Sequence, residues 1–476
     1  MAGRNHYFFV GIGGSGMSAL ADLIRRQGNV VSGSDRGHDH GDVPDKFATL
    51  AQSGMTLHKQ DGSGVDQSVN FVVVSSAVEE SIPDIQNARK LNIPVIKRAE
   101  LLSSLFNKAR GIGIAGTSGK TTTTGMTGWM LHAMGLDPTI ANGGIMPNFV
   151  GHPQSLMGNA VGGKGDLFVA EMDESDGTIS FFNPEIAVLN NITLDHKPFS
   201  VIEPLFADYL TRARMAVVNL DDPRAAKMAN VHPLTITYAV DNPAATLFAT
   251  NLQHQQGGIS FTLNDRTNGT SWPCNLPVPG RHNVSNALAA FSVAKALNQP
   301  LDKAVTALEA FKGIKRRMEV LGTAGGVTVI DDFGHNPDKI AATLDTLTAH
   351  PGRVIVMFQP HGFGPMKMMR KELVEAFTKG LRKGDTLTMP EIFYAGGTVT
   401  KDISSNDLIG DITAGGRDAH FFQTRDDAGA FMLANAKAGD RIVIMGARDD
   451  TLSEFAKDIL QKLKAAPAPI VAGAQP

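Results

Sequence analysis

The 476-residue chain is poor in cysteine, in net charge and in long apolar runs. Its one cysteine, Cys274, excludes an intrachain disulfide and a cysteine-rich metal site, and it fits a reducing compartment. Because the net charge is −3 and helix-scale lysine or arginine clusters are absent, we expect no nucleic acid partner. No apolar run is long enough for a membrane span or a signal peptide. These absences favour a cytoplasmic enzyme without a membrane partner.

What the chain does contain is a globular composition, 42% hydrophobic and 19% charged, over a length that predicts about three domains. Its most informative motif is a glycine-rich turn between an apolar segment and a predicted helix: Gly116, Thr117, Ser118, Gly119, Lys120, Thr121 and Thr122. Glycine lets backbone N–H groups approach phosphate oxygens, and the helix N-terminus adds a positive dipole end. Lys120 can reach the β- and γ-phosphates of a nucleotide, and Thr121 or Thr122 can hold Mg²⁺. The spacing departs from the general G-x-x-x-x-G-K-[ST] pattern, because Ile114 stands at the first glycine position and Gly113 one place earlier. The alternative to a phosphate-binding loop is a glycine turn followed by a solvated lysine.

A second glycine-rich turn lies near the N-terminus, between a predicted strand at 7–10 and a predicted helix at 17–24. The next strand ends in Asp35, about 20 residues further on, where a ribose partner is expected. The pattern predicts a small Rossmann-like domain that binds the diphosphate of a redox dinucleotide or of a UDP-sugar, and the phosphate loop that follows favours the sugar nucleotide. The residues expected at this site are Gly11, Gly13, Gly14, Ser15, Gly16, Asp35 and, at the polar end of a further strand, Ser75.

Polar side chains also follow the predicted strands of the central segment. A strand at 167–171 ends in an acidic run that begins with Glu171, and acids beside a phosphate loop predict Mg²⁺ ligation. The next strand is followed by His196, for which a surface histidine is the alternative. Short strands over 244–276 are expected to be antiparallel. Asn283 enters the helix that follows, where it could cap the helix or bind a purine.

The C-terminal segment repeats the alternation of strands and helices. Strands that begin at Gly326, Val354 and Arg441 each run into a polar loop, which predicts a doubly wound sheet with a site along one edge. An arginine pair that ends at Arg317 precedes them and could contact ATP, with an exposed pair as the alternative. The tail 465–476 is rich in alanine and proline and is predicted to be disordered.

Together these motifs resemble one family over nearly the whole chain, the Mur ligases of peptidoglycan synthesis. The segments that recur in the family's order are Phe9–Ser18, Gly116–Thr122, Glu171 with the acids after it, Asp195–His196, His282–Asn283, Arg316–Arg317 and Asp331–His335. The resemblance implies an α/β fold of three domains: a UDP-sugar-binding Rossmann-like domain at 1–106, a central P-loop ATPase domain at 107–312, and a Rossmann-like domain for an amino acid or peptide at 313–464.

The resemblance also implies a reaction and a set of roles. ATP phosphorylates the lactyl carboxylate of UDP-N-acetylmuramate, and an amine then attacks the acyl phosphate to give an amide, ADP and phosphate. By position, the resemblance implies nucleotide contacts for 116–122, Asn283 and Arg317. It implies that Thr121 and Glu171 ligate one Mg²⁺ and that His196 ligates a second. The catalytic positions that it implies are Lys120, His196, Asp331 and His335. We expect a cytoplasmic monomer or weak dimer.

The segment expected to recognise the amine departs from the family pattern. Members that attach L-alanine carry Q-P-H-R-Y-x-R, whereas 359–365 reads Q-P-H-G-F-G-P and lacks both arginines. An amino acid's carboxylate normally pairs with a bidentate arginine, so Lys367 or Arg370 could substitute, with Phe333 and His361 as the other amine-site residues. The run M-K-M at 366–368 resembles instead the members that attach a recycled tripeptide. L-alanine is therefore the predicted amine, a different amino acid or a tripeptide is the alternative, and a nucleotide-sugar-binding paralogue without activity is a further one.

Overall fold

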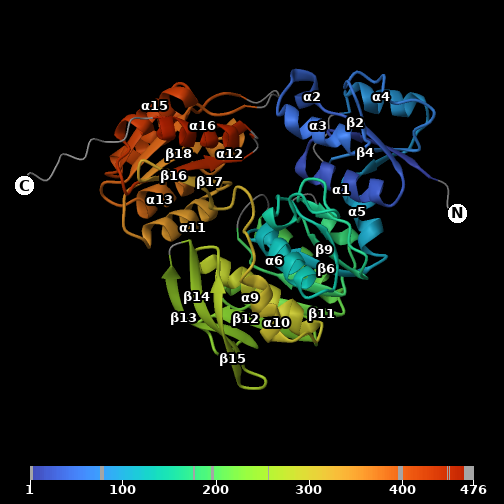
Figure 1. The fold of residues 1–476 in the computed structure, drawn as a ribbon, viewed down its shortest axis with the longest axis horizontal. Coiled ribbons are helices and arrows are strands. Elements are labelled where there is room, and N and C mark those ends of the chain that lie inside the picture. Colours follow the sequence, from blue (N-terminus) through green and yellow to red (C-terminus); the bar gives the residue numbers. More distant parts are fainter. Residues whose placement is uncertain are drawn as a thin grey trace, which may run out of the picture. The chain divides into compact units, whose positions relative to one another are not determined.

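The computed structural model describes residues 4–75, 80–174, 177–193, 198–255, 257–394, 400–447, 449 and 451–465. The chain forms two compact units, Met1–Ile314 and Lys315–Pro476 (Figure 1). Unit 1 holds two sheets and unit 2 holds one, and this confirms the expected mixed α/β architecture. The domain boundaries stay predictions. His196 and all but the first residue of the predicted tail lie outside the described residues.

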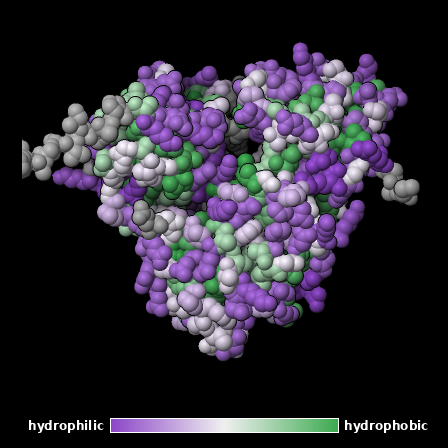
Figure 2. Space-filling view, in the orientation of Figure 1, coloured by the Kyte–Doolittle hydropathy of each residue, from purple (hydrophilic) through white to green (hydrophobic). Residues whose placement is uncertain are grey.

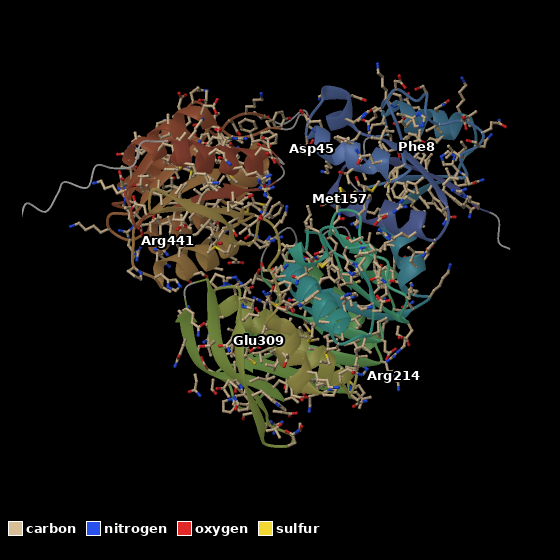
Figure 3. The ribbon with its side chains drawn as sticks, in the orientation of Figure 1. Phe8, Asp45, Met157, Arg214, Glu309 and Arg441 are labelled. Carbon is tan, nitrogen blue, oxygen red and sulfur yellow. The ribbon has the colours of Figure 1, made fainter. Side chains whose placement is uncertain are left out.

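The first sheet of unit 1 consists of parallel strands in the Rossmann-like order β3-β2-β1-β4-β5. Its elements are β1 His6–Val10, α1 Ser15–Arg26, β2 Val30–Ser34, α2 Arg36–His40, α3 Pro44–Gln52, β3 Thr56–His58, β4 Phe71–Val74, α4 Pro83–Lys90, β5 Val95–Lys97 and α5 Arg98–Phe106. Phe8, labelled in Figure 3, and Phe9 of β1 are both fully buried. They belong to two different apolar clusters, because successive side chains of a strand face opposite sides. The strand order changes direction between β1 and β4, so a ligand crevice is expected at the carboxyl ends of these strands.

The second sheet of unit 1 has the order β15-β14-β13-β12-β11-β10-β6-β9-β7-β8. Its elements are β6 Arg110–Ala115, α6 Lys120–Ala133, β7 Thr139–Ala141, the 3₁₀ turn Pro147–Phe149, β8 Ala160–Val161, β9 Leu167–Glu171, the 3₁₀ turn Thr178–Phe181, β10 Ile186–Leu189, α7 Phe199–Thr211, β11 Met215–Asn219, α8 Pro223–Lys227, β12 Thr235–Val240, β13 Leu247–Gln255, β14 Gly258–Asp265, β15 Thr270–Leu276, α9 Arg281–Ala296 and α10 Leu301–Leu308. The antiparallel pairing of β13, β14 and β15 confirms the expectation for 244–276. Helices α6 and α9 pack against each other and share an apolar core (Figure 1).

Unit 2 is built on one sheet in the order β16-β17-β21-β18-β19-β20, parallel except for β16. Its elements are β16 Glu319–Ala324, β17 Val327–Asp332, α11 Pro337–Thr348, β18 Val354–Gln359, α12 Phe363–Met368, α13 Arg370–Gly380, β19 Thr386–Pro390, α14 Ser405–Ala414, β20 Asp418–Phe422, α15 Arg425–Asn435, β21 Arg441–Gly446 and α16 Thr451–Ala465. Two apolar clusters lie on the sheet, and β18 and β21 are buried along most of their length. The sequences of these two strands are therefore nearly continuous apolar runs.

The visible surface is mainly hydrophilic, with hydrophobic residues dispersed over it (Figure 2). The exposed large apolar side chains come from separate parts of the chain: Val150, Phe181, Val201, Leu234, Val320 and Met368. Scattered residues of this kind are normal on a protein surface. Among the described residues, no helix combines the length and the apolar character that a membrane crossing requires.

Candidate active site

The phosphate loop leaves the carboxyl end of β6 and enters α6 at Lys120. Gly116 and Gly119 have φ values of 132° and 81°, a left-handed backbone that favours glycine. A Cβ on Gly119 would lie 2.6 Å from Asn286 Oδ1, and one on Gly116 would lie 3.1 Å from the backbone nitrogen of Asn191. The loop therefore requires both glycines for its own conformation and for its close approach to helix α9 and to the residues that follow β10.

Gly113, one place before the expected first glycine, has a packing role. A Cβ there would lie 2.1 Å from the hydroxyl oxygen of Tyr209. Tyr209 belongs to α7 and is fully buried, and within the described part of the chain its hydroxyl has no hydrogen-bond partner. Gly113 thus makes room for a buried ring beneath β6, and the phosphate loop itself begins at Gly116.

Asparagine side chains that follow β10 hold the loop. Asn191 Oδ1 accepts hydrogen bonds from the Ser118 N–H group at 2.8 Å and from the Thr117 hydroxyl at 2.9 Å. The Asn191 amide donates back to the Ser118 carbonyl at 3.1 Å. Three hydrogen bonds from one side chain fix the turn before any ligand is bound, which lowers the entropy cost of ordering it around a phosphate.

A chain of buried side chains continues from α6 to α9. Thr123 accepts a hydrogen bond from Asn190 at 2.9 Å and donates to Asn286 at 3.1 Å, and Asn286 donates to Asn283 at 3.2 Å. Asn283, expected to contact ATP, is buried and donates to the Pro279 carbonyl at 2.7 Å. Asn283 thus helps to hold Asn286, which links α9 to Thr123 of α6, and its contact with a nucleotide stays a prediction.

The ammonium group of Lys120 is bound within the chain. It donates hydrogen bonds to the carbonyl oxygen of Gly116 and, at 2.8 Å, to Glu174 Oε2. Glu174 is only 4% exposed. Burial raises the pKa of its carboxyl, and the charge of Lys120 opposes that rise. Glu174 belongs to the acidic run that was expected to ligate Mg²⁺, but its ion pair with Lys120 was not predicted.

Two of the expected Mg²⁺ ligands lie together. The Thr121 hydroxyl donates to Glu171 Oε2 at 2.9 Å, and a Cβ on Gly143 would lie 2.0 Å from Glu171 Oε1, so Gly143 makes room for this carboxylate. The described residues contain no group of three or more His, Cys, Asp or Glu side chains that could hold a metal ion. A hydroxyl and a carboxylate fit an ion that takes its remaining ligands from water and phosphate, as Mg²⁺ commonly does.

The N-terminal glycine turn is closed by its own hydrogen bonds. The N–H groups of Gly11 and Ile12 donate to the Ser34 carbonyl at 2.8 and 3.0 Å. Asp35 Oδ2 accepts from the Gly13 N–H group at 2.8 Å. Asp35 thus has a structural role in the turn in addition to its predicted role at a ribose.

Helix α1 has no side-chain cap, so the N–H groups of its first turn, which begins at Ser15, are available to an anion. Arg98, the first residue of α5, lies over this turn, because a Cβ on Gly16 would lie 3.2 Å from Arg98 Nη1 and 3.4 Å from its Cζ. Sequence reasoning missed Arg98. The available signal was its place directly after β5, at the same carboxyl edge of the sheet where Ser75 follows β4.

In unit 2, four expected residues lie in one cluster. The Arg317 guanidinium lies 4.8 Å from the centre of the Phe333 ring, and the His335 ring lies 5.3 Å from Phe333 and 5.5 Å from His361. The Phe333 carbonyl oxygen lies 3.0 Å from His335 Nδ1, which must therefore carry the proton. Burial, together with the charge of Lys339, lowers the pKa of His335 to about 2, so this imidazole is neutral.

The other expected residues of unit 2 are engaged in different contacts. Asp331 is buried, accepts a hydrogen bond from Ser453 at 2.6 Å, and lies 3.5 Å from the Arg316 guanidinium. Lys367 on α12 forms an exposed ion pair with Asp402, and Arg370 on α13 forms one with Asp411 at 2.8 Å.

The chain matches three family models along its length. Residues 6–110 match the model described as Mur ligase family, catalytic domain, residues 114–294 match the Mur ligase middle domain, and residues 316–448 match the Mur ligase, glutamate ligase domain. The matches cover both sheets of unit 1 and the sheet of unit 2.

Full-length relatives are also found. The UDP-N-acetylmuramate–L-alanine ligase of Desulfosudis oleivorans is 37% identical over 457 residues, which cover 93% of this chain and 96% of that protein. The protein of the same name from Dinoroseobacter shibae is 36% identical over 464 residues, with 95% and 96% covered. Among solved structures, the UDP-N-acetylmuramate–alanine ligase of Thermotoga maritima has a TM-score of 0.81 at 24% identity, with 97% of this chain and 99% of that chain covered. A murein peptide ligase of Psychrobacter arcticus has a TM-score of 0.72 at 24% identity, with 98% and 100% covered, so both share the fold.

Proposed function

The chain belongs to the Mur ligase family, and from this premise we propose that it is the ATP-dependent ligase that joins L-alanine to the lactyl carboxylate of UDP-N-acetylmuramate. The observation that carries the proposal is the identity of 34% and 37% to curated relatives of that name, over 94% and 96% of their length. The pre-formed phosphate loop supports the requirement for ATP.

The proposed reaction has two steps. The γ-phosphoryl group of ATP is transferred to a carboxylate oxygen, which gives ADP and an acyl phosphate. The amine nitrogen then attacks the acyl carbon, phosphate leaves, and the nitrogen gives up a proton. The loop N–H groups and Lys120 would bind the phosphoryl oxygens on which charge builds up, and Thr121 with Glu171 would hold Mg²⁺, which when bound neutralises part of that charge.

The other two substrates would be bound by the remaining sites. The first turn of α1 and Arg98 would bind the diphosphate of the UDP-sugar, with Ser75 beside them. In unit 2, His335 is neutral and carries its proton on Nδ1, so its Nε2 can accept a hydrogen bond from the amine. With a pKa of about 2 it would orient the amine rather than take its proton.

One observation favours a different amine. The segment 359–365 lacks both arginines of the L-alanine pattern, and Lys367 and Arg370 already hold ion pairs with carboxylates. A tripeptide or another amino acid is therefore the second candidate. We also place the reaction in the cytoplasm, which fits a chain with one cysteine, and expect a monomer or weak dimer.

The test is amine-dependent release of phosphate from ATP in the presence of UDP-N-acetylmuramate. L-alanine, glycine, L-serine and a diaminopimelate-containing tripeptide are supplied one at a time, and the product is identified by mass. Release with L-alanine and a product of the corresponding mass would support the proposal. Release with the tripeptide alone would establish the second candidate, and no release with any amine while UDP-N-acetylmuramate still binds would leave a binding protein.

A further inference from the structure

The ion pair between Lys120 and Glu174 joins the expected phosphate-binding cation to a carboxylate for which the proposed mechanism has no use. The two atoms are 2.8 Å apart, Lys120 Nζ also donates to the Gly116 carbonyl, and Glu174 is almost completely buried. An ammonium group has three N–H donors, so two are used within the chain and one is left for a ligand.

This arrangement has an electrostatic consequence for a bound nucleotide. A phosphate oxygen on the third N–H group would lie about 4.6 Å from the Glu174 oxygen, because two acceptors at 2.8 Å from one nitrogen are separated by the tetrahedral angle. Both groups are negative and Glu174 is almost completely buried, so they repel each other with less screening than two charges in water. The same carboxylate fixes the lysine in place, because a buried charge costs free energy unless it stays paired.

We propose that Glu174 is a positioning residue for Lys120, one that orients the ammonium group toward the triphosphate and at the same time weakens the binding of the nucleotide ground state. The inference rests on the proposed function, since it takes Lys120 to be the phosphate-binding lysine. Weak ground-state binding with a firmly oriented lysine favours turnover, because only interactions that strengthen in the transition state raise kcat.

The test uses the full chain with Glu174→Gln, which keeps the shape and an acceptor oxygen but removes the charge. Binding of a non-hydrolysable ATP analogue is measured by calorimetry, and kcat and KM for ATP by phosphate release. We expect the analogue to bind about threefold to tenfold more tightly and kcat to fall by about tenfold or more. The matched control is Glu185→Gln, a carboxylate of the same unit paired with Arg110 at 2.8 Å at the start of β6, which should leave nucleotide affinity unchanged.

An affinity equal to or weaker than that of the wild type, in folded Glu174→Gln, would overturn the inference. If that variant does not fold, Glu174→Asp keeps the charge but draws it back by one methylene. The analogue should then bind more tightly than to the wild type but by a smaller factor, and equal or weaker binding would again count against the inference. If the wild type itself does not bind the analogue, it is the ATP-dependent function that fails.

Discussion

The packing beneath the phosphate loop allows a prediction about stability. Tyr209 buries a hydroxyl that has no hydrogen-bond partner among the described residues, and an unsatisfied buried polar group costs about 1–3 kcal/mol. Tyr209→Phe removes only this oxygen, so we expect it to stabilise unit 1 by about 1 kcal/mol. Tyr238→Phe is the matched control: Tyr238 is equally buried, but its hydroxyl donates to Asn190 at 3.0 Å, so the same change should destabilise by about 1 kcal/mol.

A second substitution turns this into a double-mutant cycle. In the wild type, Gly113→Ala places a Cβ 2.1 Å from the Tyr209 oxygen, and such overpacking costs about 1–3 kcal/mol. In Tyr209→Phe the nearest atoms are Met172 Cγ at 3.1 Å and the ring Cζ at 3.2 Å, contacts that small shifts relieve. We therefore expect a coupling free energy of at least about 1 kcal/mol between the two sites.

The measurement is urea unfolding of the full chain, followed through the transition of unit 1, for the wild type, both single variants and the double variant. Equal costs for Gly113→Ala in the two backgrounds would refute the reasoning, because the hydroxyl would not then be the group that demands glycine. A Tyr209→Phe variant less stable than the wild type would show that the hydroxyl is hydrogen-bonded, for example to a buried water.

Three further outcomes are expected. Lys120→Ala should lower kcat by at least about a hundredfold with far-ultraviolet circular dichroism unchanged, and ligation at the wild-type rate would disprove the phosphate-loop assignment. Arg98→Ala should raise KM for UDP-N-acetylmuramate by about tenfold and leave KM for ATP unchanged, whereas Arg89→Ala, which removes an exposed partner of Glu80, should change neither. Unit 2 should lose stability as the pH falls below 6.5, the ordinary pKa of histidine, because unfolded His335 then binds a proton that the native imidazole, with a pKa of about 2, does not. The loss at pH 5 is about 2 kcal/mol and should shrink in His335→Asn, and an unaltered pH dependence in that variant would exclude His335 as its source.

The sequence predicted those features whose cause is local. Strands of apolar residues and the glycine turns at 11–16 and 116–122 are encoded in neighbouring residues, so their positions were confirmed within a few residues. Hydrogen-bond partners far apart in the chain were not predictable in this way. Glu174 pairs with a lysine 54 residues earlier. Arg98 lies over Gly16, and the G-x-G-x-x-G pattern accounts for that glycine without indicating an arginine beside it.

The same limit explains why Gly113 was read as part of an irregular phosphate motif. Nothing in its neighbourhood indicates Tyr209, which packs against it from a helix almost a hundred residues later. For Asp35 the spacing indicated a ribose partner, whereas the structure shows a carboxylate that also closes the glycine turn. One side chain can serve both purposes, because a carboxylate has about four acceptor positions.

The identity of the amine depends on whether a single cation can replace the arginine pair missing from 359–365. The ion pairs of Lys367 and Arg370 are exposed, and such pairs contribute about 0–1 kcal/mol, so either side chain could leave its partner at little cost. A lysine is a point charge without the planar fork that binds a carboxylate through two parallel hydrogen bonds, so recognition through Lys367 would be weak. L-alanine offers only a methyl group beyond its amine and carboxylate and would then show a high KM. A tripeptide has further groups to contact and depends less on one ion pair. Where both amines cause phosphate release, the ratio of their kcat/KM values therefore decides between the two candidate functions.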